Sequence, residues 1–149
     1  LGAGVSLPTE GTVFLSVKDV DKDALLPIAK DLSNIGFKLV ATSGTCAFLK
    51  EQALEVKRIN KVLEGQPHII DAIINGEIDL MINTTSKSSQ AAADSTSIRR
   101  QALQHKIPYY TLMSAASAGV QAIKALKAHD LSVSSLQSYF EEHDKEKAA

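Results

Sequence analysis

The segment FKLVATSGTCAFL, residues 37–49, changes character at its middle. Its first five residues are mainly apolar and favour a β-strand, whereas the residues after the turn favour a helix. Between them, Thr42, Ser43, Gly44 and Thr45 place three hydroxyl groups around one glycine. Serine and threonine are preferred helix N-caps, and a glycine lets backbone N–H groups approach a ligand closely. The segment therefore predicts a strand, a turn and a helix, in which the turn hydroxyls cap the helix, cradle an anion, or do both.

The rest of the chain repeats this alternation of apolar runs and helical periodicity. Strands are predicted at residues 12–17, 37–41, 56–59, 78–83 and 107–112. Helices are predicted at residues 21–36, 45–53, 68–75, 94–106, 114–129 and 132–142, with Gly36 and Gly76 as terminators. Alternating strands and helices form right-handed crossovers in a parallel sheet that is covered on both faces. We therefore expect an α/β fold.

Length and composition indicate one globular domain of 149 residues, with 44% hydrophobic and 22% charged residues. Cys46 is the single cysteine, so a disulfide framework or a cysteine-based zinc cluster within the chain is excluded. The net charge of −1 argues against a general nucleic-acid binder. No apolar run reaches the length of about 18 residues needed to span a membrane, and the first residues lack the pattern of a signal peptide. These features predict a cytoplasmic protein with neither a nucleic-acid nor a membrane partner.

The two ends of the chain differ from its middle. Residues 1–11 hold three glycines and a proline, which is typical of a linker, and residues 141–149 form a charged tail. The folded domain is expected over residues 12–140. The linker and the absence of an initial methionine suggest a domain from a longer protein.

Polar side chains follow successive predicted strands at the edge where parallel α/β sheets bind ligands. Lys22 follows the first strand, the TSGT turn follows the second, Lys61 follows the third, and NTTSKSS, residues 83–89, follows the fourth. Each of these alone is an ordinary surface residue, helix cap or polar loop. Together they would place two cations and several short donors around a helix N-terminus, which is the chemistry of a phosphate site. The pattern predicts a phosphorylated small molecule, such as a nucleotide, as ligand.

Candidates for catalysis or metal binding are few. His68 and Asp71 stand three residues apart on a predicted helix, but no third ligand has metal-site spacing. Cys46 is either a small buried side chain or a reactive thiol near a helix N-terminus. Arg99 and Arg100 either pair with carboxylates or face a partner domain. We therefore predict neither a catalytic residue nor a metal site.

Three segments resemble a known family: GFKLVATSGT, RINKVLEGQPHIIDAIINGEIDLMINTTS and IRRQALQHKIPYYT. They are similar to the C-terminal regulatory domain of the large subunit of bacterial carbamoyl-phosphate synthase, with similarity over residues 11–140. The resemblance implies a methylglyoxal-synthase-like, three-layer α/β/α fold with a five-stranded parallel sheet. It also implies allosteric control, in which UMP inhibits, IMP activates, and ornithine activates largely through a neighbouring domain.

The resemblance assigns roles to individual residues. It implies that Lys22, Thr42, Thr45 and Lys61 hold the effector phosphate. By the same resemblance, the residues that contact the nucleoside are Asn83, Thr85 and, more weakly, Ser16, and Thr111 is linked to ornithine. Ser43 stands where the family often has a histidine, and the loop after NTTS has few basic residues.

At the level of the whole enzyme, the resemblance implies a ligase that makes carbamoyl phosphate from glutamine, bicarbonate and ATP for pyrimidine and arginine biosynthesis. The parent enzyme uses ATP with Mg or Mn and works with the rest of the large subunit and a glutaminase small subunit. The domain itself is expected to be non-catalytic and to carry no cofactor. The alternative is a methylglyoxal synthase-type lyase acting on dihydroxyacetone phosphate. That reaction needs a carboxylate base, and the family's Gly-Gly-Asp segment is replaced here by EGQPHIID.

Overall fold

The computed structural model describes residues 7–60, 68–84 and 89–129, with nothing stated for the side chains of residues 89–94. The strands are β1 (Thr12–Ser16), β2 (Lys38–Ala41), β3 (Lys57–Arg58), β4 (Leu80–Asn83) and β5 (Tyr109–Tyr110). The helices are the 3₁₀ turn η1 (Asp19–Asp21), α1 (Lys22–Asn34), α2 (Ser43–Glu51), α3 (Ile69–Ile74) and α4 (Ser89–Gln104). A further helix follows β5, and its described part covers residues 113–129.

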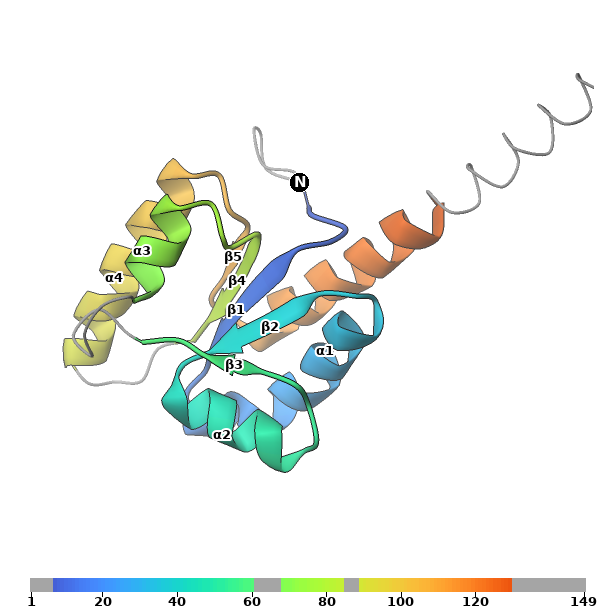
Figure 1. Ribbon diagram of the computed structural model, residues 1–149, viewed down its shortest axis with the longest axis horizontal. Coiled ribbons are helices and arrows are strands. Elements are labelled where there is room, and N and C mark those ends of the chain that lie inside the picture. The colour runs from blue at the N-terminus through green and yellow to red at the C-terminus, as the bar shows by residue number, and fades with distance from the viewer. Residues whose placement is uncertain (1–6, 61–67, 85–88, 130–149) are drawn as a thin grey trace, which may run out of the picture.

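The strands form one five-stranded sheet in the order β3-β2-β1-β4-β5, and every pair of neighbours is parallel. In the central strand, Leu15 lies opposite Ala41 on one side and Ile82 on the other. The predicted α/β fold with a five-stranded parallel sheet is confirmed. Because all strands run the same way, β1, β2 and β4 end at one edge of the sheet, and the residues that follow them gather there (Figure 1).

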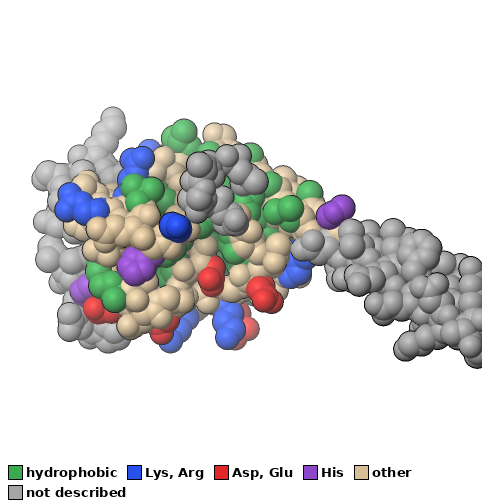
Figure 2. Space-filling view, turned by 90° about the horizontal axis from the view of Figure 1, so that it is seen from above, with side chains coloured by type: hydrophobic (Ala, Val, Ile, Leu, Met, Phe, Trp, Pro, Cys, Tyr) green, Lys and Arg blue, Asp and Glu red, His purple; other side chains and the backbone are tan. Residues whose placement is uncertain are grey.

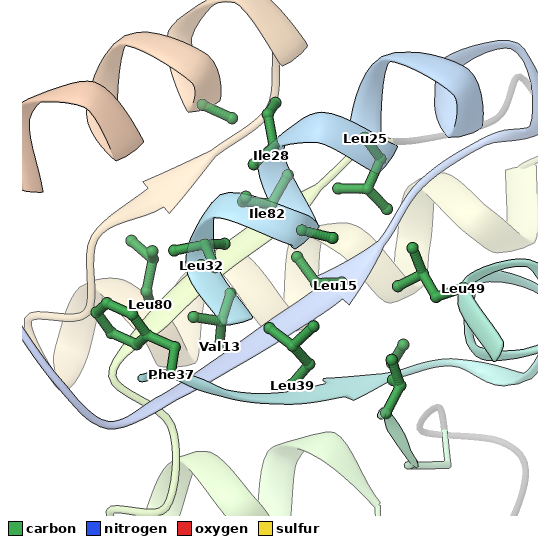
Figure 3. Packing of buried hydrophobic residues seen from close by; sticks show 14 of the residues in the cluster. Val13, Leu15, Leu25, Ile28, Leu32, Phe37, Leu39, Leu49, Leu80 and Ile82 are labelled. Carbon is green, nitrogen blue, oxygen red and sulfur yellow. The ribbon is translucent and has the colours of Figure 1, made fainter. Parts of the chain in front are cut away.

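Helices cover both faces of the sheet, which gives three layers (Figure 1). On one face, α1, α2 and the helix at 113–129 pack on Val13 and Leu15. On the other face, α3 and α4 pack on Phe14. Successive strand residues thus point to opposite cores, which explains why the central strands read as nearly unbroken apolar runs. Figure 3 shows the larger core, where Leu25, Ile28 and Leu32 of α1 meet the sheet.

Several predicted boundaries differ from the observed ones, mainly at the sheet edges. The strands predicted at 56–59 and 107–112 shrink to Lys57–Arg58 and Tyr109–Tyr110, because an edge strand pairs on one side only. The helix predicted to begin at residue 94 begins at Ser89, since the alanine-rich segment before it has high helix propensity. The helix predicted at 132–142 lies outside the described residues.

Gly36 ends α1 as predicted, with a φ of 103°. Its N–H donates to the Ser33 carbonyl at 3.1 Å, and the Phe37 N–H donates to the Leu32 carbonyl at 3.0 Å. This pair of bonds is a Schellman motif, which satisfies carbonyls that the helix end would otherwise leave free. The motif also directs Phe37 into the core beside Leu32.

The same pair of bonds ends α2, α3 and α4 at three residues with positive φ: Ala53, Gly76 and Lys106. The sequence predicts that Gly76 ends the helix before it, because glycine adopts a positive φ readily, and that prediction is confirmed. Ala53 and Lys106 carry no such signal, since residues with a Cβ rarely adopt this conformation. Their positive φ angles follow from the hydrogen bonds that end each helix, not from an intrinsic preference of alanine or lysine for this conformation.

Candidate anion-binding site

The structure brings four of the candidate residues together at the carboxyl edge of the sheet. Ser16 is the last residue of β1, and Lys22 is the first residue of α1. Thr42 and Thr45 lie at the N-cap and in the first turn of α2. The α2 turn is joined to the end of β1 by side-chain hydrogen bonds. The structure therefore places Ser16, Lys22, Thr42 and Thr45 at the same edge of the sheet.

Thr42 is the N-cap residue of α2, but its hydroxyl does not cap the helix. The hydroxyl donates to Ser16 Oγ at 3.0 Å, and the side chain makes no capping bond. Its backbone carbonyl accepts the Cys46 N–H at 2.7 Å. The expectation that the turn hydroxyls would cap α2 is therefore wrong for Thr42. The reason is that the Thr42 side chain is buried, 4% exposed, against the end of β1, where Ser16 offers an acceptor.

Thr45 links the first turn of α2 to the residue after β1. Its Oγ1 accepts the Val17 N–H at 3.1 Å and lies 3.5 Å from the Val17 carbonyl oxygen. The residue is only 2% exposed. By contrast, Ser43 and Gly44 are exposed at the start of the helix. An anion that approached here would first contact the backbone N–H groups in the first turn of α2, because these groups have no acceptor within the helix.

Lys22 lies over the same turn. A Cβ placed on Gly44 would be 3.6 Å from Lys22 Nζ, so the ammonium group stands beside the helix N-terminus. That terminus carries the positive end of the helix dipole. Two positive groups held this close are each stabilised by an anion between them. The arrangement is electrostatically suited to an anionic ligand.

Asp19 already pairs with Lys22 and was missed by the sequence analysis. Its Oδ1 lies 2.6 Å from Lys22 Nζ, while the Asp19 side chain is 93% exposed and that of Lys22 is 21% exposed. The hydrogen bond from Lys22, together with its positive charge, holds the pKa of the Asp19 carboxyl below its usual value. The three-residue spacing in DVDK was the available signal, since residues three apart in a helical turn are neighbours.

Thr84 fixes the loop that carries Asp19 and Lys22. Its Oγ1 accepts the Lys18 N–H at 3.0 Å, and its own N–H donates to the Ser16 carbonyl at 2.9 Å. The residue is buried. The segment NTTSKSS includes Thr84, but the family resemblance assigns ligand contacts only to its two neighbours, Asn83 and Thr85. The two hydrogen bonds of Thr84 hold the loop after β1 against the end of β4.

The side-chain amide of Asn83 donates its hydrogen bonds to other residues of the protein. Nδ2 donates to the Tyr109 hydroxyl at 2.7 Å and to Ser95 Oγ at 3.3 Å, and the residue is 4% exposed. Burial raises the pKa of the Tyr109 hydroxyl, and the bond from Asn83 and the charge of Arg99 oppose that rise. Tyr109 therefore stays neutral at neutral pH and accepts from Asn83. A contact between Asn83 and a nucleoside stays a prediction.

Lys61 and Thr85 lie outside the described residues. Thr111 is exposed directly after β5, and Arg99 and Arg100 are exposed on α4.

His68 and Asp71 form the two halves of a capping box at α3. The Ile70 N–H donates to His68 Nδ1 at 3.2 Å, and the His68 N–H donates to Asp71 Oδ2 at 3.0 Å. These bonds give the pair a structural role at the helix start. Cys46 is buried, and its Sγ lies 3.8 Å from the Val56 carbonyl oxygen. That burial agrees with its interpretation as a small core side chain.

A groove of about 1140 Å³ lies away from this site, along β2, β3 and α3. Neither Lys22 nor the α2 turn lines it. Its walls carry both signs of charge, including Lys38, Lys57, Glu77 and Asp79, which does not select an anion. Figure 2 likewise shows acidic and basic side chains together on the face it views.

Among the described residues, no group of three or more His, Cys, Asp or Glu side chains is placed to hold a metal ion. No helix in that part of the chain is both long and apolar enough to cross a membrane.

Comparisons with known proteins agree on one family. The model of the MGS-like domain matches residues 24–111. The carbamoyl phosphate synthase large chain of Rhizobium meliloti is 57% identical over 141 residues, which cover 95% of this chain and 12% of that protein. The C-terminal section of the large chain from Methanopyrus kandleri is 46% identical over 136 residues, covering 91% of this chain and 25% of that one. This chain thus spans a small part of the relatives it matches.

Among solved structures, methylglyoxal synthase from Elizabethkingia anophelis NUHP1 is similar with a TM-score of 0.59 at 23% identity. The match covers 75% of this chain and 77% of that one. At this level of identity the likeness concerns the fold alone.

Proposed function

The chain belongs to the family of MGS-like domains and matches carbamoyl phosphate synthase large chains over most of its length, and from this we propose that it is the allosteric effector domain of such an enzyme. In this proposal UMP inhibits and IMP activates, and both bind with the phosphate at the start of α2. The domain has no catalytic role of its own and needs no cofactor.

One observation carries the proposal: Lys22 Nζ stands beside Gly44, over the exposed first turn of α2. A cation and a helix N-terminus that share one opening suit a phosphate group. The buried hydroxyls of Thr42 and Thr45 hold the turn to β1, so the opening keeps its shape without a ligand. Lys61 is proposed as a second cation, and Ser16, Asn83 and Thr85 as nucleoside contacts.

The proposal places the domain within a larger assembly. The parent enzyme makes carbamoyl phosphate from glutamine, bicarbonate and ATP, with Mg or Mn, for pyrimidine and arginine biosynthesis in the cytoplasm. Its partners are the remainder of the large subunit and the glutaminase small subunit. Ornithine acts largely through a neighbouring domain, and Thr111 is proposed as the residue of this domain that is linked to the ornithine effect. A coupling of about 1–3 kcal/mol between effector and catalytic sites is sufficient for such control.

Calorimetric titration of the chain with UMP, IMP and their nucleosides tests this proposal. Charge-assisted hydrogen bonds contribute about 1.5–3 kcal/mol each, so uridine and inosine are expected to bind roughly tenfold or more weakly than the nucleotides. UMP and IMP should compete, because both phosphates need Lys22 and the same turn. Equal affinity for nucleotide and nucleoside, or simultaneous saturable binding of UMP and IMP, would contradict the proposal.

A further inference from the structure

The ammonium group that is proposed to receive the phosphate is already in contact with an anion of the chain itself. Asp19 Oδ1 lies 2.6 Å from Lys22 Nζ, within the range of a charge-assisted hydrogen bond. We propose that Asp19 is an internal competitor for the ligand phosphate, which lowers the affinity of the site and sets its preference for the charge of the ligand. This inference rests on the proposed function.

The backbone around Asp19 keeps its carboxylate near Lys22. The Asp21 N–H donates to the Lys18 carbonyl at 3.0 Å and closes the turn, while the Lys18 N–H is held by Thr84 of the adjacent strand end. The other carboxylate of the turn, Asp21, lies 4.0 Å from Lys18 Nζ and so has a cation of its own. Asp19 is therefore the acidic side chain of η1 that pairs with Lys22.

A phosphate arriving at Lys22 has two ways to bind. It displaces Asp19 into water, which its 93% exposed side chain permits, or it shares the three ammonium donors with Asp19. Displacement breaks an ion pair, and sharing brings two like charges together. Both routes cost free energy only when the ligand is anionic. Lys22 also holds the pKa of the Asp19 carboxyl below its usual value, so Asp19 is charged at neutral pH, where a phosphate monoester is charged too.

The cost is modest because Asp19 is exposed. An exposed ion pair is weakened by the surrounding water, so the expected change in affinity is at most roughly fivefold. Competition of this size weakens the binding of an anionic ligand without closing the site to it. Asp19 thus tunes the range of concentrations over which the site responds.

The experiment compares Asp19→Asn with the matched control Glu77→Gln. Glu77 is exposed and precedes β4, at the amino ends of the strands, whereas the candidate site lies at their carboxyl ends. The control therefore removes a charge of the same sign at a position far from the site. Calorimetry is performed with UMP, inorganic phosphate and uridine. Asp19→Asn is expected to bind UMP and phosphate roughly two- to fivefold more tightly and to leave uridine unchanged. Glu77→Gln is expected to match the wild type for all three ligands.

The outcomes separate this inference from the proposed function. If Asp19→Asn binds UMP no more tightly than the wild type while Lys22→Met binds it more weakly, the competition by Asp19 is refuted and the phosphate site stands. If uridine affinity rises as much as UMP affinity, Asp19 acts on the nucleoside, and the inference is also refuted. If neither the wild type nor Asp19→Asn binds UMP or phosphate, both the inference and the proposed function are wrong.

Discussion

Replacing Lys22 with methionine is expected to weaken UMP binding roughly 10- to 100-fold. The change keeps most of the apolar stem and removes the ammonium group that stands over the first turn of α2. A charge-assisted hydrogen bond contributes about 1.5–3 kcal/mol, and each 1.4 kcal/mol is about a factor of ten in affinity. Uridine binding should change little, because the nucleoside carries no phosphate for Lys22.

Lys30→Met is the matched control. Lys30 lies two turns further along α1, where it is exposed. The Lys30→Met variant loses the same charge without a change at the candidate site. Its affinity for UMP should therefore stay near that of the wild type. Equal affinity of the Lys22→Met and Lys30→Met variants for UMP would show that the phosphate does not bind at Lys22.

Replacing Gly11 with alanine is expected to destabilise the fold by about 3–4 kcal/mol. Gly11 has a φ of 124°, and an added Cβ would lie 2.0 Å from Asp79 Oδ2. That oxygen accepts the Thr12 N–H at 2.9 Å, and the Gly11 carbonyl accepts the Lys38 N–H at 2.9 Å. The expected loss combines about 1–2 kcal/mol of backbone strain with a broken hydrogen bond to a charged group, about 1.5–3 kcal/mol.

Gly76→Ala separates these two contributions. Gly76 also has a positive φ, 73°, but nothing lies within 4 Å of an added Cβ. Its substitution should therefore cost only the backbone strain, about 1 kcal/mol. Urea unfolding followed by circular dichroism measures both variants. Similar losses for Gly11→Ala and Gly76→Ala would mean that the contact with Asp79 contributes nothing to the start of the sheet.

The fold was predictable because its signals are local and repeated. Unbroken apolar runs such as the one around Phe14 indicate strands buried on both faces, and Gly36 and Gly76 end helices where the periodicity stops. The short edge strands were overestimated, since their length depends on pairing with a neighbour that local sequence does not reveal. The αL residues Ala53 and Lys106 were missed for a similar reason, because hydrogen bonds at the helix end outweigh their own preference.

The sequence proposed candidate residues at the strand ends, but it did not indicate which hydrogen bonds their side chains make. The sequence places Thr42 and Thr45 beside a strand end, but their side chains point inward. There the Thr42 hydroxyl donates to Ser16 Oγ, and Thr45 Oγ1 accepts the Val17 N–H at the end of β1. The amide of Asn83 likewise turns to Tyr109, a partner 26 residues away along the chain. Such choices depend on which buried polar groups need partners, and that becomes visible only once the strands are placed side by side.

The decisive measurement is an amide chemical-shift titration of the chain with UMP by NMR. The largest shifts are expected on the backbone N–H groups of Ser43, Gly44 and Thr45, and Lys22→Met is expected to reduce these shifts at equal UMP concentration. Shifts centred instead on the groove along β2, β3 and α3, with the first turn of α2 unchanged, would contradict it.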